Sequence, residues 1–254
     1  MIPVLHELRL VPGDRLVLHE AHDPRRLALL KERILAEGVQ RNPIVVSPFG
    51  EDYLVLDGAH RFRALSELGC GLVLVQLARP PAVVESWGHL VLEDALREVL
   101  GELEGVELSG RSDDPWLFSA RFSGGEEIFV RPEKGGVMRE VGLLWELQRA
   151  YRADSPVRRV EPERAPDPAP GEALVRYRRF SPGELLDVVG QGEVLPAGIT
   201  RFRIGERVLG VCFPLEKMED GAEDERNAEL RRFVEERWES GKVRRYDEPV
   251  VLFE

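Results

Sequence analysis

The sequence has few of the features that mark exported or membrane-bound proteins. Only two of its 254 residues are cysteine, Cys70 and Cys212, and their wide spacing indicates neither a disulfide framework nor a thiolate zinc site. No stretch approaches the roughly 18 consecutive apolar residues that a membrane-spanning helix needs, and no signal peptide opens the chain. We therefore expect a protein of the reducing cytoplasm that does not contact a membrane.

The chain also has fewer basic than acidic residues. Lys and Arg number 35 against 46 Asp and Glu, which gives a formal net charge of −11. Proteins that coat nucleic acid neutralise its phosphates with a basic surface, so this balance disfavours nucleic acid as a partner. Hydrophobic residues make up 43% of the chain, enough for one large core or two smaller ones, and we expect two domains.

The most informative stretch covers residues 54–65. An alternating apolar run stops at Asp57-Gly58, and apolar residues with helical spacing follow at once, which predicts a strand, a tight turn and a helix. Such a junction points backbone N–H groups and the positive end of a helix dipole at one spot. Together with His60 and Arg61, it indicates an anion site suited to phosphate. The alternative is a well-capped helix with a solvated arginine.

A carboxylate precedes the first predicted helix. Asp23-Pro24 pairs an N-cap residue with a first-turn proline, and Gly38 ends the apolar periodicity that follows. Glu20 therefore lies in the loop before a helix N-terminus, where a carboxylate can stay near other groups without entering the core. From the residues alone, a solvated surface side chain is the simpler interpretation of Glu20.

The remaining patterns predict an α+β fold with a first domain over residues 1–80 and a second over 81–254. We expect the active site in the cleft between them. The first domain should hold two short strands over 5–18, a hairpin over 43–56 and a strand over 72–77. Beyond it we expect helices over 92–103, 137–151, 182–189 and 223–239, a hairpin over 115–130, a proline-rich connection over 152–171, and strands over 174–178, 208–214 and 249–253.

The order of motifs in the first third of the chain resembles the ParB/sulfiredoxin superfamily. The motifs are the first helix, the segment 38–46, and the segment 55–61 with the apolar helix residues behind it. Ala59 stands where sulfiredoxins place their catalytic cysteine, which disfavours thiol-dependent reduction. Partition proteins of the ParB type carry Glu-Arg-Arg in this turn and a helix-turn-helix domain after it, whereas this chain has His60-Arg61 and a mixed, acidic remainder.

Within the superfamily, the chain is most similar to the free L-serine kinases, which use a nucleotide to convert the free amino acid to O-phospho-L-serine. Their acidic residue before the first helix and their Asp-Gly-x-His-Arg turn are both present. The resemblance implies that Glu20 is the general base for the serine hydroxyl, and that Asp57 lies near Mg²⁺ or the transferred group. The phosphates are then expected on Gly58, Ala59, His60 and Arg61.

The resemblance also implies an amino-acid pocket built by residues beyond the first domain. Free serine kinases place a Trp shortly after that domain, which is Trp87 here, and His89 is either a second pocket member or a helix-entry residue. Their Pro-x-x-x-Thr turn with a basic neighbour corresponds to Thr200 and Arg201, and the arginine suits the amino-acid carboxylate or the product phosphate. Without the resemblance, Trp87 is typical of a core aromatic and Arg201 of an exposed strand residue.

Two functions stay open. The first is a serine kinase that uses Mg²⁺ and either ATP or ADP, because a phosphate-binding turn does not distinguish the donors. The second is a nucleotide-binding ParB-like regulator that acts on DNA or on a protein partner. The lack of a recognisable helix-turn-helix, and the presence of Glu20 with the Thr200 region, favour the kinase. L-Serine and the nucleotide are the expected partners, and no pattern indicates an oligomeric state.

Overall fold

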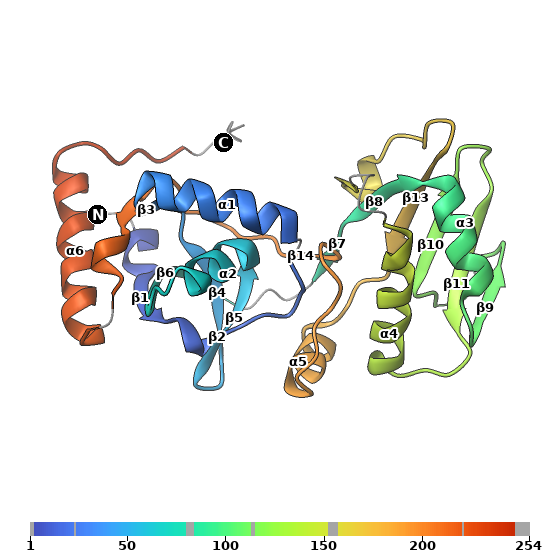
Figure 1. Cartoon of the computed structure of the whole chain (residues 1–254), viewed down its shortest axis with the longest axis horizontal. Helices are drawn as coiled ribbons and strands as arrows, with labels where there is room; N and C mark the ends of the chain where they lie inside the picture. The colour runs from blue at the N-terminus through green and yellow to red at the C-terminus, as the bar shows by residue number, and fades with distance from the viewer. Residues whose placement is uncertain are drawn as a thin grey trace.

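The computed structural model describes residues 3–22, 24–79, 84–112, 115–151, 157–219 and 221–246. Helices and strands are mixed along the chain and form two α+β units, one at each end of the long axis of the molecule (Figure 1). The predicted fold class is therefore confirmed. Within the described ranges, no helix is long and apolar enough to cross a membrane.

The first unit is built on a five-stranded mixed sheet with the strand order β1-β6-β4-β5-β2. Its elements are η1 (Pro3–Glu7), β1 (Leu8–Pro12), η2 (Gly13–Arg15), β2 (Leu16–Val17), α1 (Pro24–Glu37), β4 (Ile44–Phe49), β5 (Asp52–Asp57), α2 (Ala59–Glu67) and β6 (Leu72–Leu77). β4 pairs antiparallel with β5, as the predicted hairpin requires, and parallel with β6. Apolar side chains such as Ile44, Leu65 and Leu74 are fully buried in its core.

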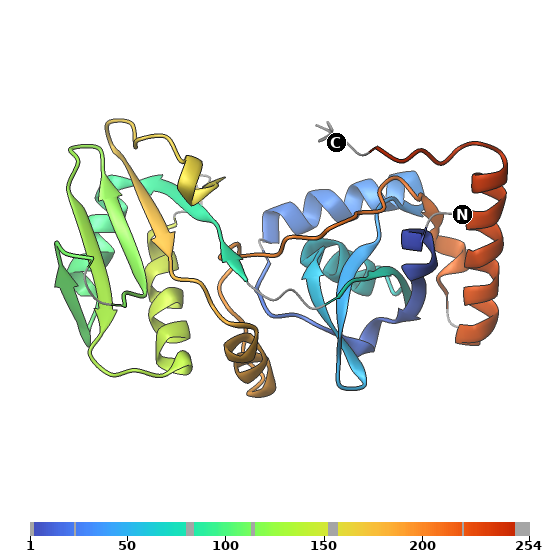
Figure 2. The same ribbon diagram turned by 180° about the vertical axis from the view of Figure 1, so that it is seen from behind.

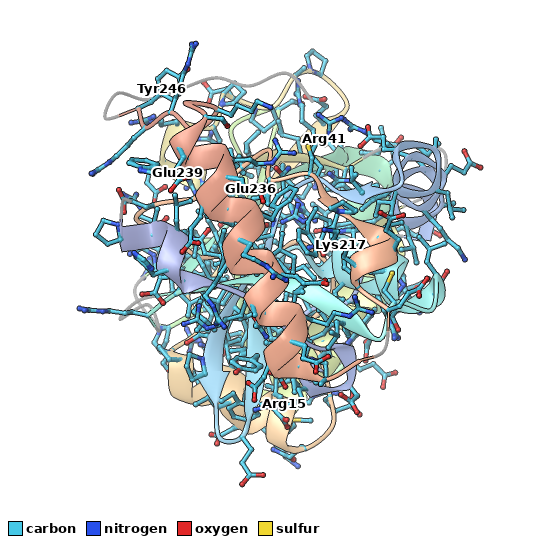
Figure 3. All side chains as sticks on the ribbon, turned by 90° about the vertical axis from the view of Figure 1, so that its left-hand side faces the viewer. Arg15, Arg41, Lys217, Glu236, Glu239 and Tyr246 are labelled. Atoms are coloured by element: carbon cyan, nitrogen blue, oxygen red, sulfur yellow. The ribbon has the colours of Figure 1, made fainter. Side chains whose placement is uncertain are left out.

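The C-terminal part of the chain returns to this first unit. The elements involved are β3 (Val39–Gln40), β15 (Phe213–Pro214), η5 (Leu215–Lys217) and α6 (Glu223–Glu239). β15 pairs with β3, and α6 lies across the end of the molecule next to β1 (Figure 3). Phe213 and Leu230 join the core of the first sheet. The predicted division assigns all of 81–254 to one domain, and so it does not place these C-terminal elements with the first sheet.

The second unit is built on an antiparallel sheet with the order β12-β8-β13-β10-β11-β9. The elements of this part of the chain are β7 (Glu85–Ser86), β8 (Gly88–Leu92), α3 (Glu93–Glu102), β9 (Val106–Ser109), β10 (Phe118–Phe122), β11 (Glu127–Pro132), α4 (Val137–Leu147), η3 (Gln148–Ala150), β12 (Arg158–Val160), η4 (Pro162–Arg164), β13 (Glu172–Tyr177), α5 (Pro182–Gly190) and β14 (Thr200–Arg201).

Most elements predicted after residue 80 are confirmed, and α6 has the predicted bounds. The strand predicted over 208–214 is wrong for most of its length, because only Phe213–Pro214 finds a partner strand. The strand predicted over 249–253 lies outside the described residues.

Two short pairings lie in the middle of the molecule. β14 pairs with β7, and Glu20 of the first unit forms a parallel bridge with Leu195 of the second. The bridge is held by hydrogen bonds from Ala21 N–H to the Leu195 carbonyl and from Leu195 N–H to the His19 carbonyl, each 2.8 Å long. β7, β14 and the first turn of α1 meet at this point in both ribbon views (Figures 1 and 2). The loop before α1 is therefore fastened to the segment before β14.

Candidate active site

The predicted anion-binding turn forms between β5 and α2. Gly58 has φ +102°, a conformation that glycine adopts without the steric penalty of other residues. A Cβ added to Gly58 would lie 2.8 Å from Nη2 of Arg61, so glycine also makes room for the guanidinium. The N-cap residue Gly58 contributes no side-chain hydrogen bond to α2. The N–H groups of the first turn have no acceptor within the helix itself, an arrangement that suits an anion.

Asp57 lies between two arginines at this turn. Its Oδ2 accepts hydrogen bonds from Arg61 Nη2 at 3.1 Å and from Arg207 Nη1 at 2.7 Å. Burial by itself raises the pKa of Asp57, but the two guanidinium groups outweigh it and bring that pKa below its ordinary value. Asp57 is therefore a carboxylate at neutral pH. No motif in the sequence points to Arg207, which comes from a loop 150 positions further along the chain.

Glu20 faces the same cleft from the loop before α1. Its Oε2 accepts the Gly198 N–H at 2.9 Å, and its Oε1 accepts both the N–H of Thr200 and the Thr200 hydroxyl, the latter at 2.5 Å. These three donors orient the carboxylate and neutralise part of its charge. The structure thus brings together Glu20 and Thr200, two predicted site residues that are 180 positions apart.

His19 makes polar contacts in the site that no motif in the sequence predicts. Its ring is only 6% exposed, with Nδ1 2.8 Å from the Val55 carbonyl and Nε2 2.7 Å from Thr200 Oγ1. The edge of the ring meets Phe202, with 5.0 Å between the centroids. Burial lowers the pKa of His19, against the opposing effects of the Glu20 charge and the Val55 carbonyl. Adjacency to Glu20 is the one signal in the sequence that points to this residue.

A pair of histidines, His22 and His60, connects the Glu20 loop to the anion-binding turn. The rings of His22 and His60 meet edge to face, with their centroids 6.3 Å apart. Together with the bond from His19 to β5 at Val55, this contact keeps the Glu20 loop beside the turn that begins after Asp57.

Trp87 and Arg201 form one wall of the cleft. The Arg201 guanidinium lies over the Trp87 ring, 4.5 Å from its centroid, and its Nη2 donates to Glu161 at 2.8 Å. The stack fixes the guanidinium in place while Arg201 stays partly exposed to the cleft. Arg159 also lines the cleft, with its guanidinium against Gly198. The neighbouring Arg158 pairs with Glu172 instead.

The structure does not bring His89 to the surface of the cleft. His89 is on β8 rather than at a helix entry, and it is 1% exposed. Its Nε2 donates to the Gly198 carbonyl at 2.8 Å, and its Nδ1 lies 3.0 Å from the Tyr177 hydroxyl and 3.2 Å from that of Tyr151. Burial lowers the pKa of His89 to about 4, so the ring is neutral. His89 supports the turn whose N–H groups hold Glu20.

These groups line one cleft of about 510 Å³ between the two units. Residues predicted for the site that line it are Glu20, Asp57, Gly58, Ala59, His60, Arg61, Trp87, Thr200 and Arg201. The cleft continues past apolar residues of α1 and β3, namely Leu30, Ile34 and Val39. A larger hollow of about 810 Å³ beside η2 and α2 gathers fewer charged side chains, among them Asp14 and Arg63. The convergence of charged groups identifies the first cleft as the site.

The donor set of the cleft fits a magnesium ion that arrives with a nucleotide. Within the described ranges, no three His, Cys, Asp or Glu residues gather into a metal-binding group. Mg²⁺ bound with a nucleotide needs only one or two carboxylates, because phosphates and waters complete its shell. Both arginines contact Oδ2 of Asp57, which leaves its Oδ1 for a cation at the edge of the anion-binding turn.

An anion-binding turn and a hydrogen-bonded carboxylate that face one cleft are parts that a phosphoryl-transfer enzyme for small molecules requires. No protein-family model matches the chain. The chain is 31% identical to the ATP-dependent L-serine kinase SbnI of Staphylococcus aureus over 98% of each sequence. It is also 47% identical to an ATP-dependent L-serine kinase of Staphylothermus marinus, over 44% of this chain and 49% of that one.

Solved structures agree with this relationship. A C-terminally truncated SbnI from Staphylococcus aureus matches 94% of this chain and 100% of its own, with a TM-score of 0.82 and 26% identity. A free serine kinase in complex with AMP matches 84% and 93% of the two chains with a TM-score of 0.61 and 16% identity, which shows a shared fold. The chain belongs to the free serine kinase family, as its motifs predict.

Proposed function

We propose that this protein phosphorylates the hydroxyl of free L-serine, with ATP as donor and O-phospho-L-serine and ADP as products. The contact of Glu20 with Thr200, in the cleft that also holds the anion-binding turn, is the observation that carries the proposal. It places a carboxylate and a hydroxyl-bearing turn beside a site for phosphate. The names of the relatives support ATP as the donor over ADP.

In this mechanism the phosphates bind the first turn of α2 from Gly58 to Arg61, and the nucleoside extends along α1. Asp57 would hold Mg²⁺, which neutralises phosphate charge when it is bound. Glu20 takes the proton of the serine hydroxyl as the hydroxyl oxygen attacks the terminal phosphorus. Trp87, Thr200 and Arg201 hold the amino acid. Positioning supplies much of the rate enhancement in such a site.

The direct test is to incubate the purified protein with L-serine, Mg²⁺ and ATP, and in parallel with ADP, and to quantify O-phosphoserine by mass spectrometry. We expect product with ATP. Replacing Glu20 by Gln should lower kcat by about 10²–10⁴-fold, because the amide cannot accept the proton. Glu32, which is exposed on α1, provides the matched control, and Glu32→Gln should keep the wild-type rate.

Absence of product with both donors, in protein that binds ATP, would exclude the kinase and favour the ParB-like regulator. Full activity in Glu20→Gln would exclude only the role of Glu20 as base. A cytoplasmic location is also our proposal, and the free thiols of Cys70 and Cys212 support it.

A further inference from the structure

The hydrogen-bonded groups around Glu20 form a chain that can bind one more proton. The chain runs from the Val55 carbonyl through His19 and Thr200 to Glu20, with contacts of 2.8, 2.7 and 2.5 Å. A carbonyl only accepts, so Nδ1 of His19 must carry a proton toward Val55. In a neutral ring, Nε2 is then a bare acceptor that faces Oγ1 of Thr200.

The Thr200 hydroxyl has one proton but two acceptors. It can donate to His19 Nε2 or to Glu20 Oε1, and not to both at once. While His19 is neutral and Glu20 is ionised, one of these two short contacts therefore lacks a hydrogen. A single proton added anywhere along the chain completes both hydrogen bonds. The uptake of one proton is thus favoured by the geometry itself.

Glu20 is not the only acceptor available to that proton. Its carboxylate already accepts the N–H groups of Gly198 and Thr200. His19 is buried and has an unprotonated nitrogen within hydrogen-bond distance of Thr200. Its ring is held on both sides, by Val55 and by the edge contact with Phe202. The geometry provides a second acceptor two hydrogen bonds away from Glu20.

We propose that His19 and Thr200 form a proton relay that takes the substrate proton from Glu20. Glu20 accepts the proton of the serine hydroxyl while the hydroxyl oxygen bonds to phosphorus and the bond to the leaving ADP oxygen breaks. The Glu20 carboxyl then donates to Thr200 Oγ1, and the hydroxyl proton of Thr200 passes to Nε2 of His19. The relay leaves Glu20 ionised and His19 as an imidazolium, and it rests on the proposed kinase function.

Two variants test the relay with the full chain, L-serine and MgATP. His19→Gln keeps an oxygen that can accept from Thr200 but cannot take up a proton. Thr200→Val keeps the backbone donor to Glu20 and removes only the hydroxyl. We expect each variant to lower kcat about 10- to 100-fold. KM for serine and ATP should change less than threefold in His19→Gln, whereas Thr200→Val should also raise KM for serine, because Thr200 is placed against the amino acid. Thr200→Ser should recover most of the rate that Thr200→Val loses, and the double variant should lose no more than either single one.

Nitrogen NMR of the histidine rings in the wild-type enzyme supplies an independent readout, with His19→Gln to assign the signal. The relay requires the neutral tautomer with the proton on Nδ1 and a bare Nε2 in the resting enzyme. A proton on Nε2 of the neutral ring would overturn the proposal. A purely structural role for His19 predicts the same tautomer, because the Val55 carbonyl accepts from Nδ1, but it does not predict a loss confined to kcat.

The outcomes separate the relay from the function on which it rests. If the wild type makes no O-phosphoserine, the proposed function fails and the relay fails with it. If the wild type is active and folded His19→Gln has the same kcat, the relay alone is overturned. Urea unfolding checks that each variant folds, and Thr200→Val decides the matter if His19→Gln does not fold.

Discussion

Gly58 shows how much of the site depends on single residues. It has a positive φ, and it leaves the space in which the Arg61 guanidinium reaches both Asp57 and the Pro43 carbonyl. The same glycine starts α2, whose uncapped first turn faces the cleft. One residue without a side chain therefore positions both a cation and several backbone donors for a phosphate.

Replacing Gly58 by Ala should weaken both the fold and nucleotide binding. The positive φ costs an alanine about 1–2 kcal/mol of unfolding free energy, and the new Cβ displaces Arg61. We expect ATP to bind about tenfold more weakly, as titration calorimetry can measure. Gly69→Ala is the control, because Gly69 also has a positive φ, at the other end of α2, with no heavy atom within 4 Å of its added Cβ. Equal ATP affinities in the two variants would contradict this account of Gly58.

At the scale of elements, α6 completes the first sheet. β1 is an edge strand, and the side chain of Asn227 on α6 serves as a partner for its backbone. Asn227 accepts the Leu10 N–H at 2.9 Å and donates to the Leu10 carbonyl at 2.8 Å, as a neighbouring strand would. Leu230 and Val234 on the same helix enter the core. The helix thereby protects an edge that would otherwise expose unpaired backbone groups.

Asn227→Ala should lower the free energy of unfolding by about 2–3 kcal/mol, because it leaves two backbone groups of Leu10 without partners near the core. Urea denaturation measures this change. Glu235→Ala, at an exposed position of α6, should stay within about 0.5 kcal/mol of the wild type. If both variants lost the same stability, the contribution would come from α6 in general and not from the pairing with Leu10.

At the scale of the whole molecule, His89 links the second sheet to the cleft. It joins β8 to the Gly198 turn, whose N–H holds Glu20 of the first unit. As a neutral ring with a proton on Nε2, it donates to Gly198 and accepts at Nδ1 from one of the two hydroxyls of the Tyr177–Tyr151 pair, which are hydrogen-bonded to each other. The two units therefore share one continuous hydrogen-bonded connection through the active site.

The burial of His89 makes the free energy of unfolding depend on pH. The pKa of His89 is about 4 in the folded protein, against 6.5 ordinarily, so between these values the unfolded chain binds more protons. Stability should therefore fall as pH is lowered from 6.5 to 4, with a contribution from His89 of about 3 kcal/mol. Urea titrations at several pH values should show a flatter dependence in His89→Gln. His6→Gln, at an exposed position, should follow the wild type, and a parallel slope in His89→Gln would refute the assignment.

Local patterns in the sequence determined much of this protein. The apolar alternation before Asp57, the helical spacing after Gly58 and the helix over 223–239 all appear in the structure where they were predicted. These features depend on backbone conformation and on neighbours within a few residues, so the sequence is sufficient to locate them. The position of Glu20 just before α1 is of the same kind, and the motifs around it were enough to indicate the family.

Only the tertiary structure decided which distant residues meet. Thr200 and His19 surround Glu20, and Arg207 reaches Asp57, because two units and a returning C-terminal segment pack around one cleft. The same packing buries His89. It therefore supports the Gly198 turn, whereas the sequence suggested a contact with the substrate. Such contacts follow from which apolar faces are buried against each other, and no spacing along the chain encodes that choice.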